Sequence, residues 1–298
     1  MGVIEVVKRY GKVFLFLIVI LVVWNYGNLV EWKEQSGKLF SIASKSETED
    51  VWDLYKYSQR EIATITEMYQ DDEELVQIVR ERFLLPPVSM EYNLTRPELE
   101  DQSMGQGNKI RQILGEMTHG FFVECGALDG ETRSNSLYFE RFLEWEGLLV
   151  EADPLNFEQV IQKRRKAWLA PTCLSLERRP QLVNFMQAKN VGKILGTNVE
   201  FNGKSAEVLC IPITTLLLAL NKKRIDYFSL DVEGSELEVL RTIDFDKFDI
   251  RTLSVEFKHV KAGKDMVQSF MKEKGYEVHS TVTRSDSLAN DFIFMKKD

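Results

Sequence analysis

The sequence predicts an α/β domain with a mostly parallel sheet, preceded by a membrane span. Short apolar runs alternate with helical patterns from about residue 109 onward, which indicates βαβ units. Acidic and glycine residues directly follow several of these runs. Residues Val13 to Trp24 form an unbroken apolar stretch near the N-terminus. These observations divide the chain into a short cytoplasmic tail (1–12), a transmembrane signal-anchor (13–30), a linker (31–60), a helical neck (61–108) and the α/β domain (109–298).

Composition excludes several classes of protein. With 44% hydrophobic residues in 298, the chain is too apolar to be disordered. Its net charge of −8 argues against a nucleic-acid partner, because such proteins usually carry a basic excess. Three cysteines without a CxxC pattern exclude a disulfide-rich miniprotein and indicate no zinc site. The three histidines are too scattered in sequence to predict a Ser-His-Asp triad.

The N-terminal apolar stretch has the features of a signal-anchor. No charge occurs between Lys12 and Glu31, and a helix of that span covers roughly 27 Å at about 1.5 Å per residue. Lys8 and Arg9 precede it, so the positive-inside rule places the N-terminus in the cytoplasm and the rest in the lumen. A cleaved signal peptide is the alternative, but no A-x-A-like site follows Trp24. A core helix of a soluble protein fits the one-sided basic flank less well.

The neck is predicted to contain one amphipathic helix. Leu75 and Val79 lie at helical spacing, acidic residues 71–72 suit the helix start, and prolines 86–87 end it. Asn93 begins the N-glycosylation sequon Asn-Leu-Thr, which a lumenal orientation would make usable.

The domain from residue 109 alternates strands with helices. The strand candidates are 121–123, 147–150, 167–170, 226–230 and 252–255, and the helix candidates are 155–165, 236–243 and 264–274. Two further strands close in sequence, 276–283 and 291–297, predict an antiparallel edge.

Ligands bind at the carboxyl ends of the strands in such sheets. Glu124 begins the loop Glu-Cys-Gly-Ala-Leu-Asp-Gly after the first strand, in which Gly126 and Gly130 allow tight turns. Leu128 replaces the second glycine of a dinucleotide fingerprint, so this loop alone is weak evidence. Glu151 follows the second strand, where a carboxylate can accept both hydroxyls of a ribose. A solvated strand-end carboxylate explains Glu151 equally well.

Other strand-end residues have structural explanations. Asp153 and Pro154 suit the first positions of a helix. Ser235 and Glu238 have the spacing of a capping box. Asp231 differs, because it follows its strand at the point where the substrate end of the cleft is expected.

Together these motifs resemble the FkbM-type family of S-adenosylmethionine-dependent methyltransferases. The similar stretches are FFVECGALDGETRSNSLYFE (121–140), LLVEADP (148–154), DYFSLDVEGSELEVL (226–240), LSVEF (253–257) and NDFIFMKK (290–297). The resemblance implies a Rossmann-like class I methyltransferase fold with a seven-stranded sheet, and O-methylation of a hydroxyl. It also implies roles for particular residues: Glu124, Gly126, Ala127, Gly130 and Glu151 would bind S-adenosylmethionine, while Asp231 and Glu233 would face the methyl acceptor.

Over its whole length the chain resembles most the Star-type branch of that family, whose members are single-pass membrane proteins. The resemblance implies a role in endoplasmic reticulum-to-Golgi and endosomal trafficking, with a membrane-bound cargo protein as partner. It places the chain in the endoplasmic reticulum or Golgi membrane with a lumenal domain, and endosome and plasma membrane are further locations. An active O-methyltransferase is the alternative function, and the resemblance leaves catalytic activity open.

Two arguments from the residues favour the export role. The strand-end candidates for a general base are Asp231, Glu233 and Glu256, and an ordinary carboxylate is a poor base for an alcohol. A lumenal domain would also be separated from cytosolic S-adenosylmethionine. In an oxidising lumen Cys173 and Cys210 could pair; three buried thiols are the alternative.

Overall fold

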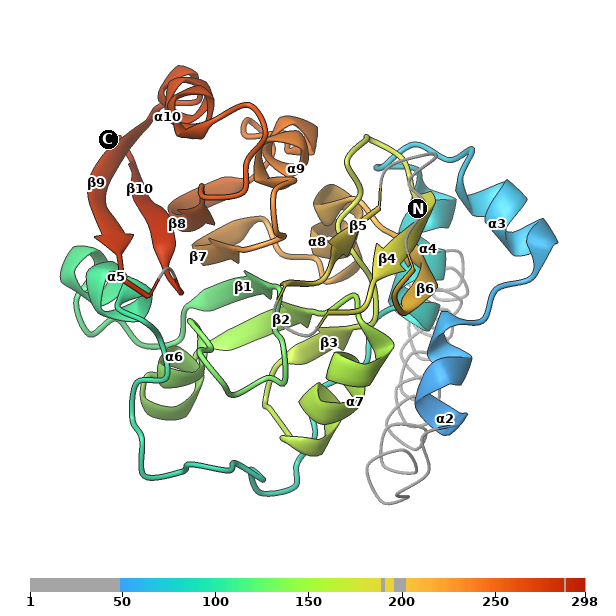
Figure 1. Cartoon of the computed structure of the whole chain (residues 1–298), viewed down its shortest axis with the longest axis horizontal. Coiled ribbons are helices and arrows are strands. Elements are labelled where there is room, and N and C mark those ends of the chain that lie inside the picture. Colours follow the sequence, from blue (N-terminus) through green and yellow to red (C-terminus); the bar gives the residue numbers. More distant parts are fainter. Residues whose placement is uncertain (1–48, 189–190, 196–201, 287, 298) are drawn as a thin grey trace, which may run out of the picture.

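The computed structural model describes residues 49–188, 191–195, 202–286 and 288–297 (Figure 1). The predicted cytoplasmic tail (1–12), the predicted membrane span (13–30) and the first part of the predicted linker lie outside these residues. Within the described part of the chain, no helix is both long and apolar enough to cross a membrane. The span and its orientation therefore stay predictions.

A seven-stranded sheet forms the centre of the molecule, in the order β3-β2-β1-β7-β8-β10-β9. Its strands are β1 (Phe121–Cys125), β2 (Glu146–Val150), β3 (Trp168–Ala170), β7 (Arg224–Leu230), β8 (Asp249–Glu256), β9 (Tyr276–Thr283) and β10 (Asn290–Lys296). The five strands β3, β2, β1, β7 and β8 are parallel to their neighbours in this order, whereas β10 is antiparallel to both β8 and β9. The prediction of a Rossmann-like, mostly parallel sheet with an antiparallel edge is confirmed.

The strand order places a switch point beside β1. From β1 the chain builds outward through β2 and β3, and it then returns to add β7 and β8 on the other side of β1. Loops leaving β1 and β7 therefore diverge in opposite directions, and ligands of open α/β sheets bind at such a point.

Helices cover both faces of the sheet (Figure 1). Successive side chains of β1 explain why, because Phe121 and Val123 pack into one buried apolar cluster and Phe122 packs into the other. The first cluster includes α4 (Glu73–Arg82), α8 (Ile213–Ala219), α9 (Glu236–Thr242) and α10 (Lys264–Glu273), and the second includes α5 (Gln106–Leu114), α6 (Leu137–Phe142) and α7 (Pro154–Gln162). The predicted helices 155–165, 236–243 and 264–274 match α7, α9 and α10.

The start of α7 is also as predicted. Asp153 caps this helix by accepting a hydrogen bond from the Leu155 amide at 2.9 Å, and Pro154 occupies a first-turn position.

The predicted neck packs against the domain. Helix α4 begins after Asp72 and ends before the two prolines, as its sequence indicated. Leu75 and Val79 are fully buried in the same cluster as α8, since both present apolar side chains on one face. Helix α5 begins at Gln106, so the predicted domain boundary at residue 109 falls within a helix.

The predicted linker is wrong at its C-terminal end. Residues 49–55 form α2 (Glu49–Trp52) and the 3₁₀ turn η1 (Asp53–Tyr55), and α3 (Gln59–Ile65) follows. Val51 and Tyr55 are 2% and 7% exposed, because their apolar surfaces pack into the cluster that contains α7. The Tyr55 hydroxyl donates a hydrogen bond to the Glu151 carbonyl at 3.2 Å, which joins this segment to the end of β2.

A second, three-stranded sheet was not predicted. It consists of β4 (Gln181–Met186), β5 (Lys193–Ile194) and β6 (Ser205–Cys210), in the order β5-β4-β6. A disulfide joins Cys173 to Cys210 and so ties this sheet to the chain after β3, which decides between the two alternatives for these cysteines. Cys125 is free and buried.

Candidate functional site

Four acidic residues meet at one edge of the central sheet. Glu124 lies in β1, Glu151 and Asp231 directly follow β2 and β7, and Glu256 ends β8. All four line one cavity of about 310 Å³, as expected for the carboxyl ends of parallel strands. Gly126, Ala127 and Glu233 line the same cavity, whereas Gly130 is not among the described residues that line it.

Glu124 organises the loop that follows β1. Its side chain accepts hydrogen bonds from the Ser134 hydroxyl at 2.8 Å, from the Asn135 amide at 2.6 Å, and from the Ser136 hydroxyl. Glu124 is 4% exposed, so these donors replace the water that the buried carboxylate has lost. The loop from residue 126 to residue 136 is therefore held against the end of β1.

Close packing requires glycine at two positions of this loop, and the sequence did not predict these contacts. Gly126 has φ +81°, and a Cβ atom there would lie 2.2 Å from the Asp231 carbonyl oxygen. Gly130 has φ +79°, and its Cβ would lie 3.3 Å from the Val160 Cα atom of α7. Gly126 thus permits the loops after β1 and β7 to touch, while Gly130 permits close packing against α7; its predicted cofactor role stays a prediction.

Glu151 is 5% exposed and holds two loops together. One oxygen accepts a hydrogen bond from the Leu128 amide at 2.8 Å, and the other accepts one from the Asp153 amide at 2.9 Å. Burial raises the pKa of Glu151 to about 8, against the opposing effect of these amide donors. A carboxylate offers about four acceptor positions, so Glu151 keeps acceptor capacity toward the cavity.

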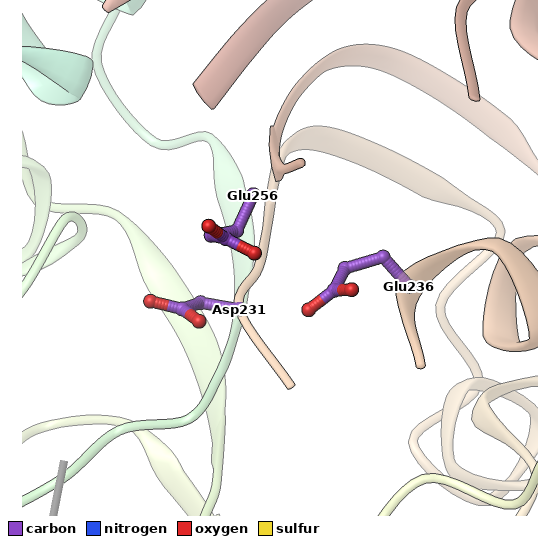
Figure 2. Close-up of side chains that lie close together, drawn as sticks. All are labelled: Asp231, Glu236 and Glu256. Carbon is purple, nitrogen blue, oxygen red and sulfur yellow. The ribbon is translucent and has the colours of Figure 1, made fainter. Parts of the chain in front are cut away.

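Carboxylates crowd the far side of the cavity, where Figure 2 shows Asp231 and Glu256 side by side. Asp231 is exposed and lines the cavity. Desolvation by the protein atoms around its carboxyl, followed by the Glu256 charge, raises the pKa of Asp231 to about 7. Burial and then Asp231 raise the pKa of Glu233 to about 8, and burial raises the pKa of Glu256.

His259 belongs to this side of the cavity. Its Nδ1 lies 2.8 Å from Glu233 Oε2 and 3.8 Å from Glu256 Oε2, and its side chain is 42% exposed. The cavity therefore holds an imidazole beside the predicted base candidates Asp231, Glu233 and Glu256. His259 follows Glu256 by three residues, so the strand-end rule would have found it if applied a few residues further along.

Three carboxylates are close enough to share one cation. Oxygen atoms of Asp231, Glu236 and Glu256 lie within 4.8 Å of one another, and Figure 2 shows the three side chains around the end of the sheet. Glu236, however, accepts hydrogen bonds from the Val232 amide at 2.9 Å and the Gly234 amide at 3.1 Å. This carboxylate therefore already has a structural role in the loop after β7.

The same bonds correct the predicted capping box at the start of α9. Ser235 makes no side-chain cap there. Glu236, one residue further on, satisfies the amides of the preceding loop in its place, because the left-handed conformation of Glu233 (φ 56°) turns them toward it.

Fold and site together define a class: a Rossmann-like, methyltransferase-type domain with a glycine loop after its first strand and an acidic residue after its second. The sequence is more specific. The family model described as "Methyltransferase FkbM domain" matches residues 124–278, more than half of the chain, and the protein belongs to that family.

Solved structures share only low sequence identity with the chain. The METTL16 MTase domain is 13% identical with a TM-score of 0.39, over 87% of this chain and 92% of that one. A methyltransferase from Pyrococcus furiosus is 13% identical with a TM-score of 0.35, over 74% and 94% of the two chains. No curated protein shows significant similarity to the sequence.

Proposed function

We propose that this FkbM-type domain binds S-adenosylmethionine and transfers its methyl group to a hydroxyl. One observation carries the proposal: the loop after β1, Glu151 and the Glu233–His259 pair all line a single cavity at the switch point of the sheet. When bound, S-adenosylmethionine supplies an electrophilic methyl group.

The cavity residues fit this cofactor. Glu151 is buried yet keeps acceptor capacity for ribose hydroxyls. The side-chain oxygen of Asn135 is buried, has no hydrogen-bond partner among the described residues, and belongs to a residue that lines the same cavity. An unpaired buried acceptor is costly, so a donor such as the ammonium group of the cofactor would stabilise it.

His259 and Glu233 would act on the acceptor. If the Nδ1–H group of His259 donates a hydrogen bond to Glu233, 2.8 Å away, Nε2 of the neutral ring carries no proton and keeps its lone pair. That nitrogen would take the proton from the acceptor hydroxyl when its oxygen receives the methyl group, which S-adenosylmethionine would release from its sulfonium sulfur. Glu233 fixes the ring orientation, and in its ionised form it would stabilise the imidazolium. An imidazole in the cavity weakens one of the two arguments for export over catalysis, the lack of a base other than a carboxylate. The other argument, the separation of a lumenal domain from cytosolic S-adenosylmethionine, is unaffected.

Calorimetric titration of the full chain with S-adenosylmethionine tests cofactor binding. We expect Glu151→Ala to weaken binding roughly tenfold, because it removes a buried acceptor. Glu146→Ala is the control: Glu146 lies at the exposed start of β2, the strand that Glu151 follows, and this variant should bind like the wild type. Asp231→Ala should keep cofactor binding and lose methyl transfer. Lack of binding by the wild-type chain would contradict the proposal.

We further propose a Star-type role, in which residues 13–30 anchor the chain in the endoplasmic reticulum or Golgi membrane and the domain exports membrane-bound cargo from the lumen. The uncharged span behind Lys8, Arg9 and Lys12 supports this orientation. The Cys173–Cys210 disulfide supports an oxidising compartment, since such bonds are rare in the cytosol.

Two measurements in cells test this role. Asn93 is exposed, and its side-chain amide donates a hydrogen bond to the Gln162 carbonyl at 3.0 Å. Glycan on Asn93, seen as a mobility shift on glycosidase treatment, is expected from a lumenal domain, whereas a protease-protected N-terminus would reverse the orientation. Deletion of residues 13–30 should abolish cargo export, and Asp231→Ala should leave it near normal.

A further inference from the structure

A buried ion pair lies behind the loop that lines the cavity. Arg165 and Glu140 have side chains only 0% and 1% exposed, with Arg165 Nη2 3.0 Å from Glu140 Oε2. Arg165 Nε also donates to both Glu140 oxygens, at 3.1 and 3.0 Å. Neither residue belongs to the described wall of the cavity, so the pair lies outside reach of a ligand there.

The remaining donors of Arg165 point to the loop itself. Its Nη1 donates to the Gly130 carbonyl and to the Ser134 hydroxyl, the latter at 3.2 Å. Its Nη2 donates to the Ser136 hydroxyl at 3.1 Å. Both serine hydroxyls in turn donate to Glu124. One guanidinium therefore contacts the loop at three places and is one hydroxyl away from the carboxylate at the end of β1.

This arrangement needs arginine rather than any cation. The guanidinium is planar and presents five donors in fixed directions, whereas a lysine ammonium has three donors on a single atom. Lysine could still face Glu140, but one nitrogen atom cannot also reach Gly130, Ser134 and Ser136. The pattern of contacts thus separates charge pairing with Glu140 from support of the loop.

We propose that Arg165 is the positioning residue of the cofactor side of the cavity: it holds the loop 126–136 and Glu124 in the binding geometry without touching the cofactor. The inference rests on the proposed binding of S-adenosylmethionine. It predicts that a loop without this support samples other conformations, and that binding then becomes weaker because part of the population is not competent.

The test compares Arg165→Lys with wild type in the full chain, by calorimetry with S-adenosylmethionine and by amide hydrogen exchange. We expect roughly tenfold weaker binding and roughly tenfold faster exchange in residues 126–136, from the loss of about one to two hydrogen bonds' worth of loop stability. Exchange in the buried strand β8 should stay at the wild-type rate. Asp226→Asn is the matched control. It changes another buried charged side chain, which lies on β7 and accepts a hydrogen bond from the Phe121 amide at the start of β1, away from the loop 126–136.

A second variant covers the case in which Arg165→Lys fails to fold. Arg165→Met combined with Glu140→Gln removes both buried charges, and such replacements are often tolerated. The new glutamine side chain keeps an acceptor for the Lys166 amide, which Glu140 now bonds at 2.7 Å. Fast loop exchange in this folded double variant supports the inference. Wild-type exchange and wild-type affinity in either folded variant would overturn it. If the wild-type chain binds no cofactor, the proposed function fails, and the exchange rates alone still decide the role of Arg165.

Discussion

The carboxylates on the two sides of the cavity have different neighbours. On the cofactor side, Glu124 and Glu151 are each buried and satisfied by backbone amides or hydroxyls. On the acceptor side, Asp231, Glu233 and Glu256 lie close to one another, and each has a raised pKa. Burial raises the pKa of Glu151 as well, so the two sides differ in what faces their carboxylates and not in the direction of the pKa shift. Amides and hydroxyls fix Glu124 and Glu151 on the proposed cofactor side, whereas neighbouring carboxylates face Asp231 and Glu233 on the proposed acceptor side.

Removing the disulfide should have the largest effect. The Cys173→Ala/Cys210→Ala variant opens a loop of 37 residues beside the cavity, and we expect a loss of about 4 kcal/mol in unfolding free energy. Denaturant titration under oxidising conditions measures it. Cys125→Ala, which alters a free buried thiol, is the control and should cost about 1 kcal/mol. Equal losses in both variants would contradict a stabilising role for the bond.

Gly126→Ala should be nearly as severe. The new Cβ would meet the Asp231 carbonyl in a left-handed residue, so we expect a loss of about 3 kcal/mol in unfolding free energy. Gly275→Ala is the matched control, because Gly275 has φ +86° and open space around its Cβ position. It should cost about 1 kcal/mol. If the two variants were equally stable, the contact between the loops after β1 and β7 would not matter.

His259→Asn should separate the two sides by activity. Loss of the base should lower methyl transfer about 100-fold, while the affinity for S-adenosylmethionine and the unfolding free energy stay within error of wild type. Transfer of a labelled methyl group to a hydroxyl acceptor gives the rate. His279→Asn, an exposed change on β9, should leave the rate unaltered. Full activity in His259→Asn would show that His259 is not the base.

The last prediction concerns how stability depends on pH. Burial and then the Asp231 charge raise the pKa of Asp291 to about 7, against about 3.9 in an unfolded chain. The folded protein therefore binds a proton that the unfolded chain releases, and stability falls as pH rises from about 4 to 7. Asp291→Asn should make this fall shallower in denaturant titrations at the two pH values, because the unfolded variant has no proton to release at this position. An unchanged slope would show that Asp291 does not titrate in this window.

The sequence predicts the sheet better than it predicts the site. Alternating apolar runs locate the strands, and the strand-end rule correctly brings Glu124, Glu151, Asp231 and Glu256 to one edge. The small sheet of β4 to β6 was not predicted because its strands are only partly apolar, β5 has just 2 residues, and β4 pairs with β6 across the intervening β5.

Contacts between distant or folded segments explain what the sequence left out. Gly130 packs against α7, and Glu236 takes the place of the expected cap at Ser235. Arg165 carries no motif at all, and only the folded chain brings it to Ser134 and Ser136.

If residues 13–30 span a membrane as proposed, the bond from Tyr55 to the end of β2 limits how far the cavity could lie from that membrane. Because Val51 and Tyr55 pack into the domain, the tether between the predicted span and the folded body is limited to residues 31–48. Those 18 residues reach at most about 65 Å when fully extended, at about 3.6 Å each. A chain anchored through residues 13–30 would thus search only a thin layer next to the membrane. Acceptors or cargo that are themselves membrane-bound would be met there at high effective concentration, whereas soluble ones would gain nothing from the anchor.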